Sequence, residues 1–219
     1  MQSNIIKVAL SVRSNLRHLD CMLKIDRFSR RVVQLIVGLV IYGISMAMMI
    51  QANLGLDPWD VLHQGLAPRL GLSFGWTVNL LGVIVLLLWL PLRQRPGVGT
   101  VLNILIIGTM TDLGLAVIPH PETIAARLVL LCAGVLLNGL AGGAYIGAGL
   151  GPGPRDGLMT GFCRRTGLPV NIVRTVIELT VLIVGWALGG TVGFGTVIYA
   201  VSIGWIVHHS LPAFTVGKA

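Results

Sequence analysis

The segment GLDPWD at residues 55–60 returns as GPGPRD at residues 151–156, which lie 96 positions later in the chain. The same offset continues without a gap. GL at residues 71–72 falls on GL at 167–168, and GVGTV at 97–101 falls on GFGTV at 193–197. Apolar composition alone would not align Gly, Pro and Asp together. We therefore predict two related halves, at residues 30–119 and 126–215, that together form one membrane domain.

Each half contains three apolar runs long enough to cross a bilayer, which takes about 18 to 20 residues. Only 11% of the residues are charged, whereas a soluble domain carries about 25%, so the surface has too little charge to face water. The sequence predicts an all-α integral membrane protein whose surroundings are the lipid bilayer. The six expected spans are residues 32–52, 76–92, 98–118, 124–148, 169–188 and 194–208.

The basic residues gather in alternate loops. Of the 16 Lys and Arg, only Arg69 and Arg127 fall on one side, and Arg174 falls inside the fifth span. The others lie before the first span, in the loops after the second and fourth spans, and at the C-terminus. Because Lys and Arg are enriched in cytoplasmic loops, we predict that both termini are cytoplasmic. The net charge of +8 then follows from topology, and no nucleic acid partner is expected.

The tail 1–29 is predicted to be cytoplasmic, and Met22 offers an alternative start to the protein. Three spans in each half would turn the second half upside down relative to the first, as in inverted-repeat transporters. This inference requires that residues 58–70 and 154–166 do not cross the bilayer, and about 13 residues are too few to do so. These two segments could form interfacial helices, or re-entrant helices whose ends are buried by protein.

Each short segment has a Pro at its start and an Asp two residues later, at Asp60 and Asp156. One interpretation is structural, because Pro suits a first helical turn and an Asp there complements the helix dipole. The other is that these carboxylates bind a cation or proton, or hold a gate, where broken helices meet at a repeat interface. Arg155 stands where the first half has Trp59. A cytoplasmic Arg and an interfacial Trp would explain that difference by topology alone.

The fifth span carries Arg174 and Glu178 four residues apart, on one helical face. Ionisable groups at membrane depth usually face the bundle interior or a wet cavity. They could form a neutralised structural pair, or Glu178 could be an ion site. Asn103 in the third span is a further candidate, although buried amides often only join helices. His208 and His209 lack a third metal ligand, so neither a metal site nor a cofactor is expected.

Residues 58–66 (PWDVLHQGL), 71–75 (GLSFG) and 151–159 (GPGPRDGLM) resemble the bacterial YczE/YyaS/YitT-type membrane proteins, and YczE-like members most closely. The resemblance extends over about residues 30–211. It implies a multi-pass protein of the bacterial cytoplasmic (inner) membrane, in a family with no settled biochemical activity.

The inverted repeat and its intramembrane charges favour a small-molecule or ion transporter over other functions. The alternative is a non-transporting membrane partner that assembles or regulates another protein. An enzyme is not expected, because the sequence lacks a paired nucleophile and base. The sequence leaves the substrate and any homo-oligomer open.

Overall fold

The computed structural model describes residues 28–216 and is all-helical, without a strand in that range. Six of its helices are long and apolar enough to cross a membrane, which confirms the predicted class. They are Phe28–Ala52, Phe74–Leu92 (α3, Phe74–Leu87, with α4, Trp89–Leu92), α5 (Val98–Val117), α6 (Ile124–Gly147), α8 (Val170–Ala187) and α9 (Phe194–Phe214). The predicted tail and the alternative start at Met22 lie almost entirely outside the described residues.

Large apolar side chains cover the outside of the bundle. Val117, Val201 and Leu90 are each 74% exposed or more. Such a surface suits contact with hydrocarbon, where each helix satisfies its own backbone hydrogen bonds.

The last span is longer than expected, since α9 continues to Phe214 past the predicted end at His208. Ser210 is buried against Gly143 of α6, and its hydroxyl lies 3.4 Å from the carbonyl oxygen of Gly139. The polar sequence at residues 208–210 thus includes a packed position and does not mark the end of the helix.

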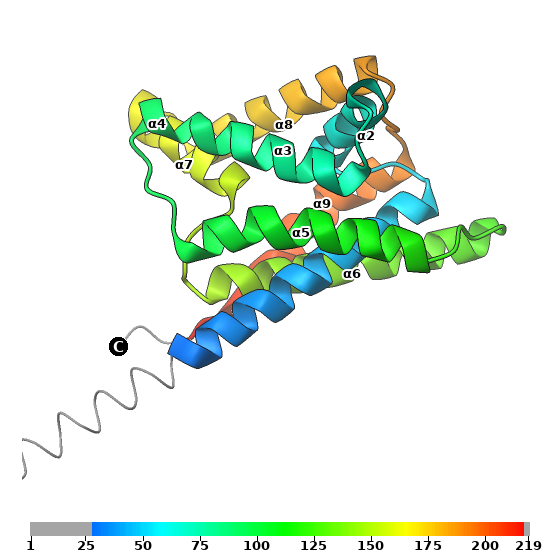
Figure 1. Ribbon diagram of the computed structural model, residues 1–219, viewed down its shortest axis with the longest axis horizontal. Helices are drawn as coiled ribbons and strands as arrows, with labels where there is room; N and C mark the ends of the chain where they lie inside the picture. The colour runs from blue at the N-terminus through cyan, green and yellow to red at the C-terminus, as the bar shows by residue number, and fades with distance from the viewer. Residues whose placement is uncertain (1–27, 217–219) are drawn as a thin grey trace, which may run out of the picture.

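Two short helices of 13 residues lie where the sequence predicts them, α2 at Pro58–Leu70 and α7 at Pro154–Thr166. Each begins with Pro in its first turn. Each ends at a glycine in the left-handed region, Gly71 (φ 65°) or Gly167 (φ 73°), a conformation that favours glycine over other residues. Figure 1 shows α7 beside α4 at one end of the molecule and α2 at the other.

The two halves contact each other through pairs that correspond across the 96-residue offset. The Gly99 amide donates to the Leu150 carbonyl over 2.9 Å, and the Gly195 amide donates to the Leu54 carbonyl over 2.7 Å. Gly99 corresponds to Gly195, and Leu54 to Leu150. The second contact is therefore the first one with the halves exchanged.

The same exchange occurs where the short helices pack. A Cβ placed on Gly65 of α2 would lie 2.8 Å from the Cβ of Leu188, and one on Gly161 of α7 would lie 3.0 Å from a methyl carbon of Leu92. Gly65 corresponds to Gly161, and Leu92 to Leu188. Each short helix thus packs on the opposite half with the same residues.

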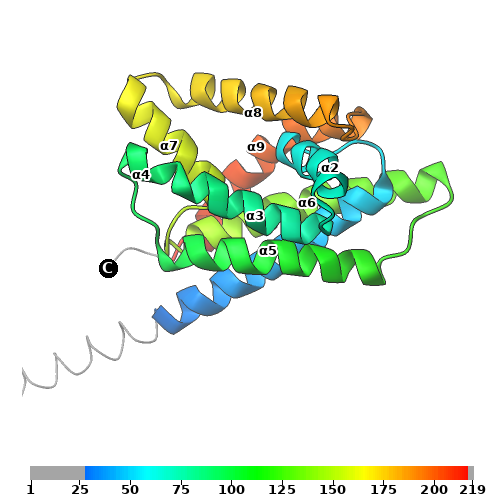
Figure 2. The ribbon, with the colours of Figure 1, turned by 45° about the horizontal axis from the view of Figure 1, so that its top comes forward.

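One pair of helices breaks this correspondence. In the first half, α3 and α5 pack along their length, as Figure 2 shows. Gly108 of α5 lies so close to Gly75 and Asn79 that it has no room for a side chain. In the second half, α8 and α9 have no comparable packing. Gly204, the counterpart of Gly108, has nothing within 4 Å of a Cβ placed on it.

Candidate functional site

The first turn of α2 holds two buried aspartates. Asp57 is the N-cap, and its Oδ1 accepts a hydrogen bond from the Asp60 amide over 2.9 Å. Asp60 is 0% exposed, and its Oδ1 lies 3.0 Å from Nδ1 of His63. Asp57 therefore caps α2, since a side chain three residues before an amide is placed to accept from it. The Asp60 carboxylate instead faces the interior.

Arg155 reaches these aspartates from the other half. Its guanidinium nitrogens lie 3.8 Å from Oδ1 of Asp57 and 3.6 Å from Oδ1 of Asp60. The guanidinium carbon lies 5.1 Å from the ring centroid of Trp59, within cation–π range. The explanation of Arg155 by topology alone did not include these ionic partners, and only 28% of its side chain is exposed. The first turns of α2 and α7 therefore meet inside the protein, which favours the re-entrant alternative.

These ion pairs leave polar atoms unsatisfied. The Oδ2 atoms of Asp57 and Asp60 are buried and have no hydrogen-bond partner among residues 28–216. Distances of 3.6 and 3.8 Å exceed hydrogen-bond length. Burial raises the pKa of both carboxyls above the usual value for aspartate, and the positive charge of Arg155 opposes that rise. Buried polar atoms are normally paired, so these two oxygens are acceptors to which a further hydrogen-bond donor could bind.

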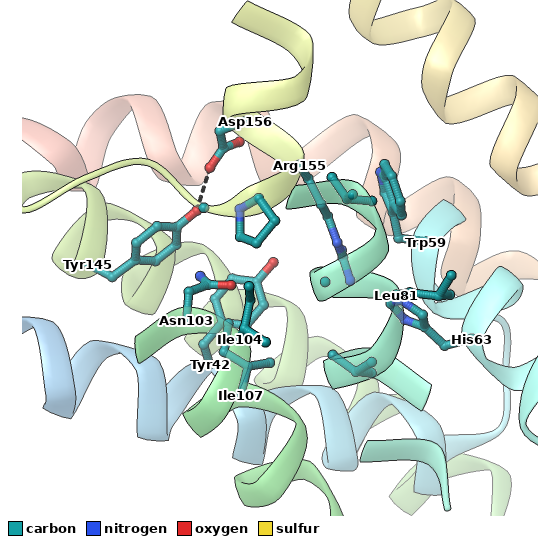
Figure 3. A pocket seen from close by; sticks show the side chains of 15 residues that line it. Tyr42, Trp59, His63, Leu81, Asn103, Ile104, Ile107, Tyr145, Arg155 and Asp156 are labelled. Carbon is teal, nitrogen blue, oxygen red and sulfur yellow. Dashed lines mark hydrogen bonds between the residues drawn. The ribbon is translucent and has the colours of Figure 1, made fainter. Parts of the chain in front are cut away.

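Asp156, next to Arg155 in α7, takes a different partner. Its Oδ2 accepts a hydrogen bond from the Tyr145 hydroxyl over 2.7 Å. Figure 3 shows this bond, with Asn103 below it and Arg155 pointing toward Trp59 and His63. These side chains line a cavity of about 80 Å³. Asn103 thus lies close to the charged cluster without joining its ion pairs.

A larger cavity of about 380 Å³ shares Tyr145, Arg155 and Asp156 with the smaller one and is lined also by α8 and α9, which are apart. The sequence contains three tyrosines, and all of them, Tyr42, Tyr145 and Tyr199, line this one cavity. The charged residues lining it are Asp57, Arg155, Asp156, Arg174 and Glu178. In the cavity wall the Nε of Arg174 donates to Oε1 of Glu178 over 2.7 Å.

The residues singled out from the sequence therefore gather around one region. The larger cavity is lined by Arg155, Asp156, Arg174 and Glu178, the smaller one by Asn103, and Asp60 lies behind Arg155. Within the described residues, no group of three His, Cys, Asp or Glu side chains could hold a metal ion.

Sequence reasoning missed Asp57, His63 and the three tyrosines. Asp57 corresponds to Gly153, so the repeat gives no signal for it. The tyrosines could have been noticed, because each is a rare polar aromatic residue within a predicted span.

A family of unknown function (DUF6198) matches residues 29–211. The chain belongs to this family. An uncharacterized protein of Haemophilus influenzae is 40% identical over 177 residues, which cover 81% of each chain. The uncharacterized membrane protein YczE of Bacillus subtilis is 37% identical over 177 residues, with 80% of this chain and 82% of YczE covered.

YyaS, an uncharacterized protein of Bacillus subtilis, is 25% identical over 183 residues, with 80% of this chain and 90% of YyaS covered. No solved structure matches the chain. These relatives confirm the family expected from the sequence, and their names assign it to no activity.

Proposed function

We propose that this protein is a small-molecule or ion transporter of the bacterial inner membrane, built from two inverted halves that alternate between two arrangements. One observation carries the proposal: a charged cluster at the junction of the halves borders a 380 Å³ cavity on one side of the molecule. Substrate sites of inverted-repeat transporters lie at such a junction, where broken helices meet.

The inversion is supported by the exchanged contacts. When residue i contacts residue j and their counterparts contact each other in the reverse sense, the two units are related by a two-fold axis. The Gly99–Leu150 and Gly195–Leu54 hydrogen bonds have this form. The first helix and α6 also run in opposite directions in Figure 1. A two-fold axis in the membrane plane accounts for both observations.

The difference between the halves suggests which arrangement is present. The cavity is lined from the N-terminal half of α8, near Arg174, and from the C-terminal half of α9, near His208. Arg93, Arg164 and Arg165 lie together at the C-terminal end of α7, which leads into the N-terminal half of α8. Clustered basic residues favour the cytoplasmic face. We therefore assign this structure to an inward-facing state.

The counterpart surface in the first half is closed. Asp112 of α5 accepts hydrogen bonds from the Ser73 hydroxyl over 2.5 Å and from the Gly75 amide over 2.7 Å. Its counterpart is His208, which lines the open cavity. In the outward-facing state, α3 and α5 would separate and α8 and α9 would close.

Disulfide trapping tests this exchange without knowledge of the substrate. A Cβ on Gly82 of α3 would lie 3.7 Å from the Cβ of Ile104 of α5, within the range for a disulfide. The pair Gly82→Cys with Ile104→Cys should therefore cross-link in native membranes when Cys21, Cys132 and Cys163 are replaced by Ser. It serves as the reference for the closed side.

The counterpart pair is Glu178→Cys with Ala200→Cys, across α8 and α9. We expect it to cross-link as well, because the halves exchange arrangements during transport. If the Gly82/Ile104 pair forms and the Glu178/Ala200 pair never does, the bundle is static and the transport proposal is wrong.

The orientation has a separate test. An epitope tag inserted beside His120, in the loop between α5 and α6, should be accessible from outside spheroplasts, whose outer membrane has been removed. Accessibility only after the membrane is opened would contradict the proposed topology.

A non-transporting partner role remains the second candidate, motivated by the basic N-terminal tail. A stable complex retained through mild-detergent purification, together with no α8–α9 cross-link, would favour it over transport.

A further inference from the structure

We propose that the larger cavity binds a small organic cation, a protonated amine, between aspartate carboxylates and the faces of the tyrosine rings. This inference rests on the proposed transport function and names its substrate class. It is carried by the lining of the cavity, by its charge balance and by an unpaired buried carboxylate oxygen.

The lining is aromatic to an unusual degree for this chain. All three tyrosines, which come from three different helices, converge on the cavity together with Trp59. Two of the hydroxyls donate hydrogen bonds to other residues. Tyr145 donates to Asp156, and Tyr199 donates to Oδ1 of Asn138 over 3.1 Å. Aromatic faces attract ammonium groups, and recurrent sites for amines use this attraction.

The charge balance around the cavity is negative. Arg174 neutralises Glu178, at 2.7 Å. Arg155 alone faces both Asp57 and Asp60, and Asp156 has only the neutral hydroxyl of Tyr145. With every carboxyl ionised, two negative charges have no counter-charge. Uncompensated charge is costly inside a membrane protein, so a cationic occupant is favoured.

The unpaired Oδ2 of Asp57 indicates which part of the cavity would hold the cation. Asp57 lines the cavity, is 2% exposed, and its Oδ2 has no hydrogen-bond partner among the described residues. An ammonium group donates up to three hydrogen bonds. It could pair with Oδ2 after the Asp57 side chain rotates, because this oxygen has almost no accessible surface in the present arrangement. An anion would instead meet three lining carboxylates, while both lining arginines already face carboxylates. His208 and His63 are the other titratable groups near the site.

The test uses four compounds that share a four-carbon chain and differ in charge: butylammonium, 1-butanol, butyrate and 4-aminobutyrate. The full-length protein in nanodiscs of zwitterionic lipid is heated with each compound at neutral pH, and the unfolding midpoint is recorded. Ligands that bind only the folded state raise that midpoint in a saturable way. We expect butylammonium to raise it, and 1-butanol and butyrate to leave it unchanged.

The variants are Asp156→Asn and Asp57→Asn. Asn can still accept from Tyr145 and is a good N-cap, so both variants should fold. We expect each to weaken butylammonium binding at least tenfold. Glu122→Gln removes the same charge from an exposed loop and should change binding less than twofold.

Three results would overturn the cationic class. The first is a larger rise of the unfolding midpoint with butyrate or 4-aminobutyrate than with butylammonium, and the second is no rise with butylammonium. The third is a midpoint that rises when the pH is lowered and that no amine raises further. The α8–α9 cross-link requires no ligand. A cross-link without amine binding would therefore reject the substrate class and leave the transport proposal standing. Amine binding without a cross-link would reject transport and leave the amine site standing.

Discussion

Replacing Arg155 with Met should destabilise the protein strongly, although Met is apolar and unbranched like the stem of Arg. The change leaves the carboxylates of Asp57 and Asp60 buried beside each other without a cation. His63 is the remaining polar neighbour, at 3.0 Å from Asp60, and it cannot replace a guanidinium that faces both carboxylates.

The distances set the magnitude. Unit charges 3.6 to 3.8 Å apart attract by about 4 to 5 kcal/mol at an effective dielectric constant of about 20. Solvent screens part of this, because 28% of the Arg155 side chain is exposed, and desolvation of the charges offsets more. Removing one partner of a buried pair typically costs about 3 to 5 kcal/mol, and we expect a loss in that range.

The measurement is the free energy of unfolding in mixed micelles, titrated with dodecyl sulfate at pH 7.5. Arg164→Met is the matched control, since Arg164 is an exposed residue of the same helix and its loss should cost less than about 0.5 kcal/mol. The triple variant Asp57→Asn, Asp60→Asn, Arg155→Met is neutral and should recover at least half of the loss. A stable single variant, or a triple variant no more stable than the single one, would refute the charge-pairing argument.

Three further predictions follow from the same contacts. The loss caused by Arg155→Met should shrink between pH 8 and pH 5, because burial raises the carboxyl pKa values in the folded state and protons then neutralise both groups; an equal loss at both pH values would contradict this. Gly157→Ala would drive a methyl group into the buried indole of α4 and should cost about 1 to 3 kcal/mol of unfolding free energy, whereas Gly204→Ala faces open space and should be tolerated; equal midpoints for the two variants would count against the packing. Asp112→Ala removes the hydrogen bonds that join α5 to the start of α3, so it should increase the yield of the α8–α9 disulfide, and an unchanged yield would show that this contact does not hold the closed face.

The repeat, the spans and the two short helices could be predicted from the sequence because each depends on local pattern. A run of apolar residues has to be long enough to cross hydrocarbon, and Gly71 and Gly167 end their helices wherever the fold places them. The residues of the site were also largely predictable, since charge within an apolar chain is rare enough to be conspicuous.

What those residues touch was decided only by the tertiary structure. Arg155 and Asp57 are 98 positions apart, and the repeat pairs Asp57 with a glycine, so no local pattern connects them. The convergence of the three tyrosines likewise depends on how helices from both halves pack. The separation of α8 from α9 was still harder to predict from the sequence. The two related halves carry nearly the same pattern, and only packing determines which of them is open.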